Sequence, residues 1–152
     1  MALSTDKTIG VLNDLIETCK DGEYGFNSCA EHVKTPDLQQ VFTARAGECR
    51  KGAQELQALV RQLGGDADEG GSASGASHRG WVAGKGTLSG YSEKAMLEEC
   101  ERGEDAALAR YRDALKEDLP PSARAVVERQ YEGVKRNHDQ IRTLRDRARA
   151  AT

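Results

Sequence analysis

The sequence predicts an all-α protein: a four-helix bundle made of two helical hairpins. Apolar residues recur at alternating spacings of three and four through four long stretches, which is the pattern of helices with one buried face. Aromatic residues make up only 5% of the chain, and almost no segment shows the β-branched alternation of a strand. A long, glycine-rich segment at 64–91 separates the four stretches into two pairs.

The first helix is expected over residues 5–33, with Thr5 and Asp6 as N-cap candidates. Two glycines lie inside it, at positions 22 and 25, and each lowers helix stability by about 1 kcal/mol relative to alanine. Two explanations stay open at this point. The glycines let a neighbouring helix approach closely, or they are tolerated defects.

The second helix is expected over residues 36–63. Thr35 is the N-cap candidate, and Pro36 suits the first helical position because its missing N–H has no helical partner there. Gly64 and Gly65 supply the stop, since glycine readily adopts the left-handed conformation that ends many helices.

The third helix is expected over 92–118 with Ser92 as N-cap, and the fourth over 121–148 after the proline-rich turn at 119–122. Short turns make each pair antiparallel, whereas the crossover at 64–91 is long enough to span the bundle. The second and third helices should therefore run parallel, as in ferritin-like bundles. At this length one domain over residues 1–152 is expected.

An ionisable residue interrupts each of the four predicted apolar faces. These residues are Glu23, Arg45, Glu101 and His138. When residues are counted outward from the two short turns, all four fall near one level of the bundle. A buried charge is unfavourable unless it is paired or bound to a metal, so the sequence predicts a polar core layer.

One interpretation of this layer is a metal site. Its candidate ligands are Glu23, Glu48, Glu101, Glu104 and His138, which suit iron, manganese or zinc. Di-iron bundles also use a Glu-x-x-His motif on two helices. Lys135 lies three residues before His138, so that motif is missing there, and a complete di-iron centre is not expected.

Two other interpretations need no metal. In a closed network, Arg45 or Arg50 pairs with Glu23, and His138 pairs with Glu101, which would fix helix register at the expense of stability. In the third interpretation, small helix rotations leave Glu104 and Arg45 solvated on the flank of the bundle.

The four cysteines are dispersed and form no CxxC motif. Cys19 and Cys49 are expected to face each other across the first hairpin. They are either apolar packing residues or a redox-active pair of thiols. Cys29 and Cys100 are expected to be packing or flank residues.

The crossover motif GASHRGWVAGKG contains Trp81 and His78. The tryptophan either pins the crossover onto the bundle or belongs to a patch that binds an anion or a partner. The conformation of residues 76–88 stays open: the segment could form a short helix, which its glycines would weaken.

Composition excludes several classes of function. The net charge of −3 argues against general nucleic-acid binding, which requires a basic face. No apolar run reaches the roughly 18 residues of a membrane span, and the opening MALSTDKTIG lacks the pattern of a secretory leader. We therefore expect a cytoplasmic protein with reduced thiols.

Several segments together resemble a bacterial family of unknown function that is ferritin-like in fold. They are LNDLIETCKDGEYGF, AEHVKTPDLQQVF, ASHRGWVAGK, LEECERGEDAALARYRDAL and LPPSARAVVERQYEGVKRNHDQIRTLRD. The resemblance covers essentially the whole chain and implies the crossover topology. It implies no particular activity, because the family has none assigned.

Three functions remain open from the sequence. The first is a non-catalytic or weakly metal-binding bundle linked to stress or storage. The second is a metal-dependent oxidase, peroxidase or iron-handling protein. The third is an interaction module that forms a homodimer, since Val11, Leu15 and Val41 widen the apolar faces of the first hairpin. No particular protein partner follows from the sequence.

Overall fold

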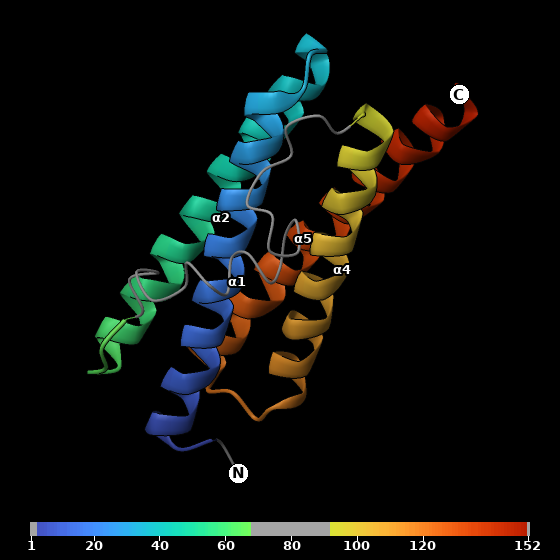
Figure 1. Cartoon of the computed structure of the whole chain (residues 1–152). Coiled ribbons are helices and arrows are strands. Elements are labelled where there is room, and N and C mark those ends of the chain that lie inside the picture. The colour runs from blue at the N-terminus through green and yellow to red at the C-terminus, as the bar shows by residue number, and fades with distance from the viewer. Residues whose placement is uncertain (1–2, 68–91, 152) are drawn as a thin grey trace.

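The computed structural model describes residues 3–67 and 92–151. Within them lie four helices: α1 (Thr5–His32), α2 (Pro36–Gln62), α4 (Glu93–Lys116) and α5 (Pro121–Ala150). Figure 1 shows α1 antiparallel to α2, α4 antiparallel to α5, and α2 parallel to α4. The predicted fold class is confirmed, and each predicted helix boundary lies within two residues of the observed one.

The helix ends follow from local chemistry. Ser4 is the N-cap of α1, because its hydroxyl accepts the Lys7 N–H at 3.2 Å; Thr5 and Asp6 already lie in the helix, so their prediction as caps was wrong. Ser92 caps α4 as predicted, accepting the Ala95 N–H at 3.1 Å. These hydroxyls satisfy amide groups that have no partner within the helix.

The end of α2 depends on Gly64. Its φ of 82° lies in the left-handed region that residues with a Cβ avoid. In this conformation the Gly64 and Gly65 N–H groups both donate to carbonyls in the last turn of α2, each at 3.0 Å. The predicted stop signal is therefore correct.

Two apolar clusters form the core, one toward each end of the bundle. The first, which includes Leu12, Leu56 and Val127, lies toward the start of α1 and the end of α2. The second, which includes Phe26 and Phe42, lies toward the turn between α1 and α2. Helix α1 packs on α2, and α4 packs on α5. Contacts between α1 and α4 join the two hairpins. Polar groups gather between the clusters.

Part of the predicted crossover lies outside the described residues. This part includes the whole motif with His78 and Trp81 and the possible short helix at 76–88. Among the helices that the structure describes, none is both long enough and apolar enough to span a membrane.

Candidate functional site

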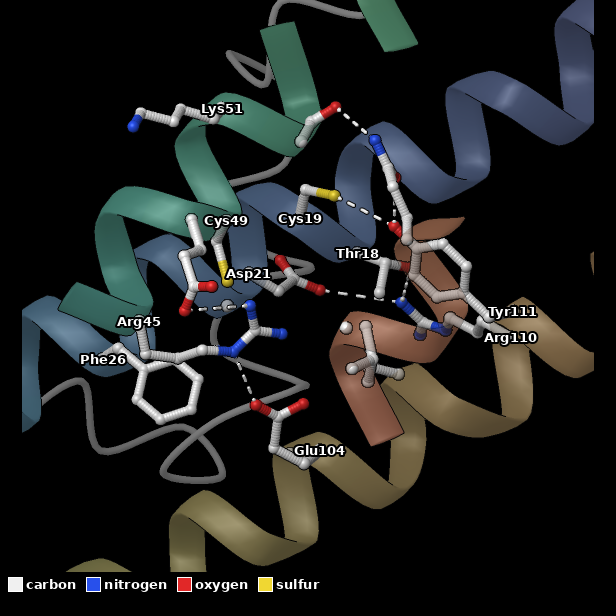
Figure 2. Close-up of a pocket in the computed structure, with 18 of the residues that line it drawn as sticks. Thr18, Cys19, Asp21, Phe26, Arg45, Cys49, Lys51, Glu104, Arg110 and Tyr111 are labelled. Atoms are coloured by element: carbon white, nitrogen blue, oxygen red, sulfur yellow. Dashed lines mark hydrogen bonds and ion pairs between the residues drawn. The ribbon is translucent and has the colours of Figure 1, made fainter. Parts of the chain in front are cut away.

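A cavity of about 570 Å³ lies between the two apolar clusters, in the middle of the bundle. All four helices contribute to its walls, and Figure 2 shows the central side chains. The described residues that carry its chemistry are Thr18, Cys19, Asp21, Phe26, Arg45, Glu48, Cys49, Lys51, Glu55, Glu104, Arg110, Tyr111, Arg129, Gln130 and Arg136. Because two hairpins meet here, the cavity could not be located from any single helix.

A buried ion pair crosses the cavity from α2 to α4. The Arg45 Nε–H donates to Glu104 Oε1 over 2.9 Å, and the side chains are only 10% and 2% exposed. The Phe26 ring, whose centroid lies 5.8 Å from Arg45 Cζ, supports the guanidinium group. Glu48 lies at the outer side, 4.0 Å from Arg45.

The buried surroundings of Glu104 disfavour its negative charge, and Arg45 stabilises that charge. Burial raises the pKa of this carboxyl group, and the charge and hydrogen bond of Arg45 act in the opposite direction. The pair is therefore interdependent, because neither charge would be favourable at this depth without the other.

A second polar chain links the cavity wall to the outside of the bundle. The Tyr111 hydroxyl donates to Gln130 Oε1 at 2.7 Å and lies 3.3 Å from Cys19 Sγ. Gln130 in turn donates to the Gly52 carbonyl at 3.3 Å and to Glu55 at 2.8 Å. One tyrosine thereby connects α1, α4 and α5, while Gln130 connects α5 to α2.

Further charges lie at the edge of the cavity. Arg110, which is half exposed, lies 3.7 Å from the buried Asp21 carboxylate and donates to Thr18 Oγ1 at 3.3 Å. Arg129 pairs with Glu55 on the opposite side. These pairs place an α1–α4 contact and an α2–α5 contact around the same opening.

The two thiols that the sequence suggested as a redox pair both line the cavity. Burial raises the pKa of Cys19 to about 11 and also raises the pKa of Cys49. A thiol is nucleophilic mainly as the thiolate, so neither is activated at neutral pH. Whether Cys19 and Cys49 bond to each other stays a prediction.

Gly22 explains how Cys49 fits. A Cβ at this glycine would lie 2.8 Å from Cys49 Sγ, closer than side-chain atoms normally come. Of the two explanations for Gly22, the structure therefore favours the one in which the glycine lets the neighbouring helix α2 approach closely.

The polar layer in the core contains ion pairs other than the predicted ones. Arg45 binds Glu104, while Glu23 lies half-buried beside Lys20 at 3.7 Å. The buried acid of α1 is instead Asp21. The predicted Arg45–Glu23 pairing was thus wrong, because Glu23 sits to the side of the buried face of α1.

On the second hairpin the predicted pairing of Glu101 with His138 was also wrong. Glu101 pairs with Arg145, and His138 Nε2 lies 2.5 Å from the Asp105 carboxylate. Counting residues outward from the turn between α4 and α5 placed Glu101 opposite His138. In the structure, each α4 residue instead lies opposite an α5 residue that is further along the chain. A shift of one turn carries different side chains to the core level.

The five candidate metal ligands are not gathered at one point. Glu48 is 58% exposed, Glu104 binds Arg45, and Glu23, Glu101 and His138 have the separate neighbours given above. Within residues 3–67 and 92–151, no group of three or more His, Cys, Asp or Glu side chains could hold a metal ion.

Sequence reasoning missed several site residues. Nothing local in the sequence marked the Tyr111 hydroxyl as a link between helices. Gln130 and Arg110 lie beside the predicted faces rather than on them, so periodicity gave no signal. Asp21 could have been found by considering a slightly rotated face of α1.

The four described helices, with α2 parallel to α4, define a ferritin-like four-helix bundle. The fold is shared with a solved mutant of Dps1 from Mycobacterium smegmatis, at a TM-score of 0.77 and 15% sequence identity. The alignment covers 94% of this chain and 99% of that one. At this identity the similarity concerns the fold alone.

The family is given by the sequence. Residues 7–117 match the model of a domain of unknown function, DUF2383, and the chain belongs to that family. No curated protein sequence matches the chain. The expected resemblance to a ferritin-like family without an assigned activity is therefore confirmed, and the function has to be argued from the cavity.

Proposed function

We propose that this protein is a non-catalytic ferritin-like bundle that binds a small, carboxylate-bearing molecule in its core cavity. The observation that carries the proposal is the position of Arg45 in a cavity of about 570 Å³. Pockets for small molecules typically have volumes of roughly 300–1,000 Å³ and a few convergent polar groups.

The guanidinium group of Arg45 is suitably placed to receive a carboxylate. Its Nε is bound to Glu104, and Figure 2 shows the group directed into the cavity between Cys49, Asp21 and Glu104. The Phe26 ring limits its movement. A fixed guanidinium binds a planar carboxylate well, because its N–H groups match the spacing of the two oxygens.

The rest of the lining suits a small amphipathic anion. Among the described lining residues the basic side chains outnumber the acidic ones, five to four. The basic residues are Arg45, Lys51, Arg110, Arg129 and Arg136, and the acidic ones are Asp21, Glu48, Glu55 and Glu104. Phe26, Val134, Ala106 and Ala107 offer apolar surface for the body of the ligand.

The state of the reactive groups favours binding over catalysis. Burial holds the pKa of Cys19 at about 11 and raises the pKa of Tyr111 well above its ordinary value. Both groups are therefore protonated at neutral pH and lack the activated form that nucleophilic or basic catalysis requires.

The test is thermal unfolding of the full chain with benzoate and, as a neutral comparison of nearly equal shape, benzamide. Benzoate should raise Tm in a saturable way, and benzamide should raise it far less. The double variant Arg45→Met/Glu104→Leu removes both charges while keeping side-chain volume, and it should lose the response to benzoate.

A matched control is Arg145→Met/Glu101→Leu, which removes another arginine–glutamate pair between helices but does not border the cavity. It should keep the benzoate response. Equal responses to benzoate and benzamide, or a response that survives in the Arg45 double variant, would overturn the proposal.

A cytoplasmic location, a homodimer and a role in stress or storage are consistent with this function. They remain predictions.

A further inference from the structure

A second pair of thiols lies away from the cavity, where the two hairpins meet. Cys29 Sγ in α1 and Cys100 Sγ in α4 are 3.3 Å apart, and both residues are 0% exposed. Neither lines the cavity. Figure 1 shows this end of the bundle, where α1 finishes beside the beginning of α4.

The surroundings of the pair are apolar. Cys29 and Cys100 belong to the same core cluster as Phe26, Met96 and Ile141. Burial raises the pKa of Cys100 well above its ordinary value, so this thiol is protonated at neutral pH while the bundle is closed. In this structure the buried Cys100 sulfur is therefore not activated as a thiolate.

The pair is nevertheless close to two helix ends. Cys29 lies in the last turn of α1, which ends at His32, and Cys100 lies in the second turn of α4, which begins at Glu93. Helix ends open locally far more often than the whole domain unfolds. Local opening at these helix ends is the route by which a dissolved oxidant would reach the two buried sulfurs.

We propose that Cys29 and Cys100 form a reversible disulfide when the protein meets a hydroperoxide, tying the first hairpin to the second. A sulfur–sulfur bond is about 2.05 Å long, so the two sulfurs need to approach by little more than 1 Å from their positions in the thiol form. The four cysteines are free in the structure, which is the reduced state of this pair.

The reaction balances with hydrogen peroxide as oxidant. The thiolate of one cysteine attacks a peroxide oxygen, the O–O bond breaks, and the leaving hydroxide takes a proton to become water. The resulting sulfenic acid is attacked by the second sulfur. The S–S bond then forms, the S–O bond breaks and a second water leaves.

The other two thiols are less suited to this chemistry. Cys19 Sγ is engaged with the Tyr111 hydroxyl at 3.3 Å, and Cys49 packs tightly against Gly22. Both lie near the middle of their helices, where local opening is less frequent.

A bond between Cys29 and Cys100 would join residues that are 71 positions apart. Closing so long a loop restricts the unfolded chain, and for a domain of this size the expected rise in Tm is on the order of 10 °C. The stabilisation should disappear when the bond is reduced with dithiothreitol.

The test treats the reduced full chain with hydrogen peroxide, blocks remaining thiols with N-ethylmaleimide, and maps disulfides by peptide mass spectrometry without reduction. We expect loss of two hydrogens, a Cys29–Cys100 crosslinked peptide and a higher Tm. The variant Cys19→Ala/Cys49→Ala should still form the crosslink, and Cys100→Ala should not.

Three outcomes would overturn the proposal. One is a crosslink between Cys19 and Cys49 in place of the expected pair. Another is oxidation of Cys29 or Cys100 to sulfinic acid without a crosslink. The third is no mass change in the folded chain under conditions that oxidise the urea-unfolded chain.

Discussion

Arg45 and Glu104 form an ion pair in the interior, with 2.9 Å between Nε and Oε1 and almost no exposure of the carboxylate. The pair connects α2 of the first hairpin to α4 of the second. It lies between two apolar clusters, where a simple bundle would continue with apolar side chains. A buried pair of this kind is generally no more stabilising than apolar packing, so its presence calls for another role.

Breaking this pair should destabilise the protein strongly. Glu104→Ala leaves the arginine charge buried without its main partner, and we expect a loss of about 3–5 kcal/mol in the free energy of unfolding. Arg45→Met/Glu104→Leu should be close to wild type or more stable, since both charges are removed. Urea unfolding of the single and double variants measures the difference. A double variant that loses as much stability as Glu104→Ala, or more, would show that the two residues do not act as a pair.

The raised pKa of Cys19 predicts lower stability at alkaline pH. The thiol has a pKa of about 9 in the unfolded chain and about 11 in the folded protein, so the unfolded state loses its proton first as pH rises. The free energy of unfolding should therefore fall between pH 9 and pH 11, by up to about 3 kcal/mol from this group, with no such effect below pH 9.

Urea unfolding as a function of pH measures this effect. In Cys19→Ala the free energy of unfolding should decline less steeply with pH over the same range. Only the slopes are compared, because the substitution also removes packing contacts and so lowers stability at every pH. If the wild type and the variant lose stability in parallel above pH 9, the thiol is not responsible.

Two glycine-to-alanine substitutions, at Gly47 and at Gly22, should change the stability of the protein differently. Gly47→Ala in α2 meets no atom within 4 Å and should stabilise the protein by about 1 kcal/mol through helix propensity. Gly22→Ala would bring a Cβ to 2.8 Å from Cys49 Sγ, so it should gain less or lose stability. Adding Cys49→Ala should restore the gain, as thermal unfolding can determine. A Gly22→Ala variant as stable as Gly47→Ala would contradict the close packing.

Glu101→Ala/His138→Ala tests the interpretation of the polar layer as a metal site. The two residues contact Arg145 and Asp105 respectively, so we expect a modest loss of stability, on the order of 1 kcal/mol. Elemental analysis of protein purified without chelator should give the same iron, manganese and zinc content for variant and wild type. About one metal per chain in the wild type, lost in the variant, would restore the metal interpretation.

The sequence predicts the fold more fully than the site for a physical reason. Helix boundaries depend on local signals such as Ser92, Pro36 and Gly64, which act within a few residues of their own positions. The topology follows from loop lengths. These features can be evaluated from one segment of chain at a time.

The site depends on how separate helices are registered against each other. Arg45 was predicted to enter the core, and it does, but its partner is Glu104 rather than Glu23. Which acid faces Arg45 depends on the rotation of α1 about its axis, which turns Glu23 to the side, and on the register of α2 against α4. Helical periodicity fixes neither of them. The contact between Cys29 and Cys100 joins distant segments in the same way and was likewise missed.

The most direct measurement of the central claim is a titration of ¹⁵N-labelled protein with benzoate, followed through the arginine Nε–Hε resonances. The Arg45 signal, assigned by its absence in Arg45→Met/Glu104→Leu, should shift with benzoate to a plateau and move little with benzamide. An Arg45 signal that stays in place while exposed arginines away from the cavity, such as Arg142, drift without saturation would show that the cavity does not bind the carboxylate.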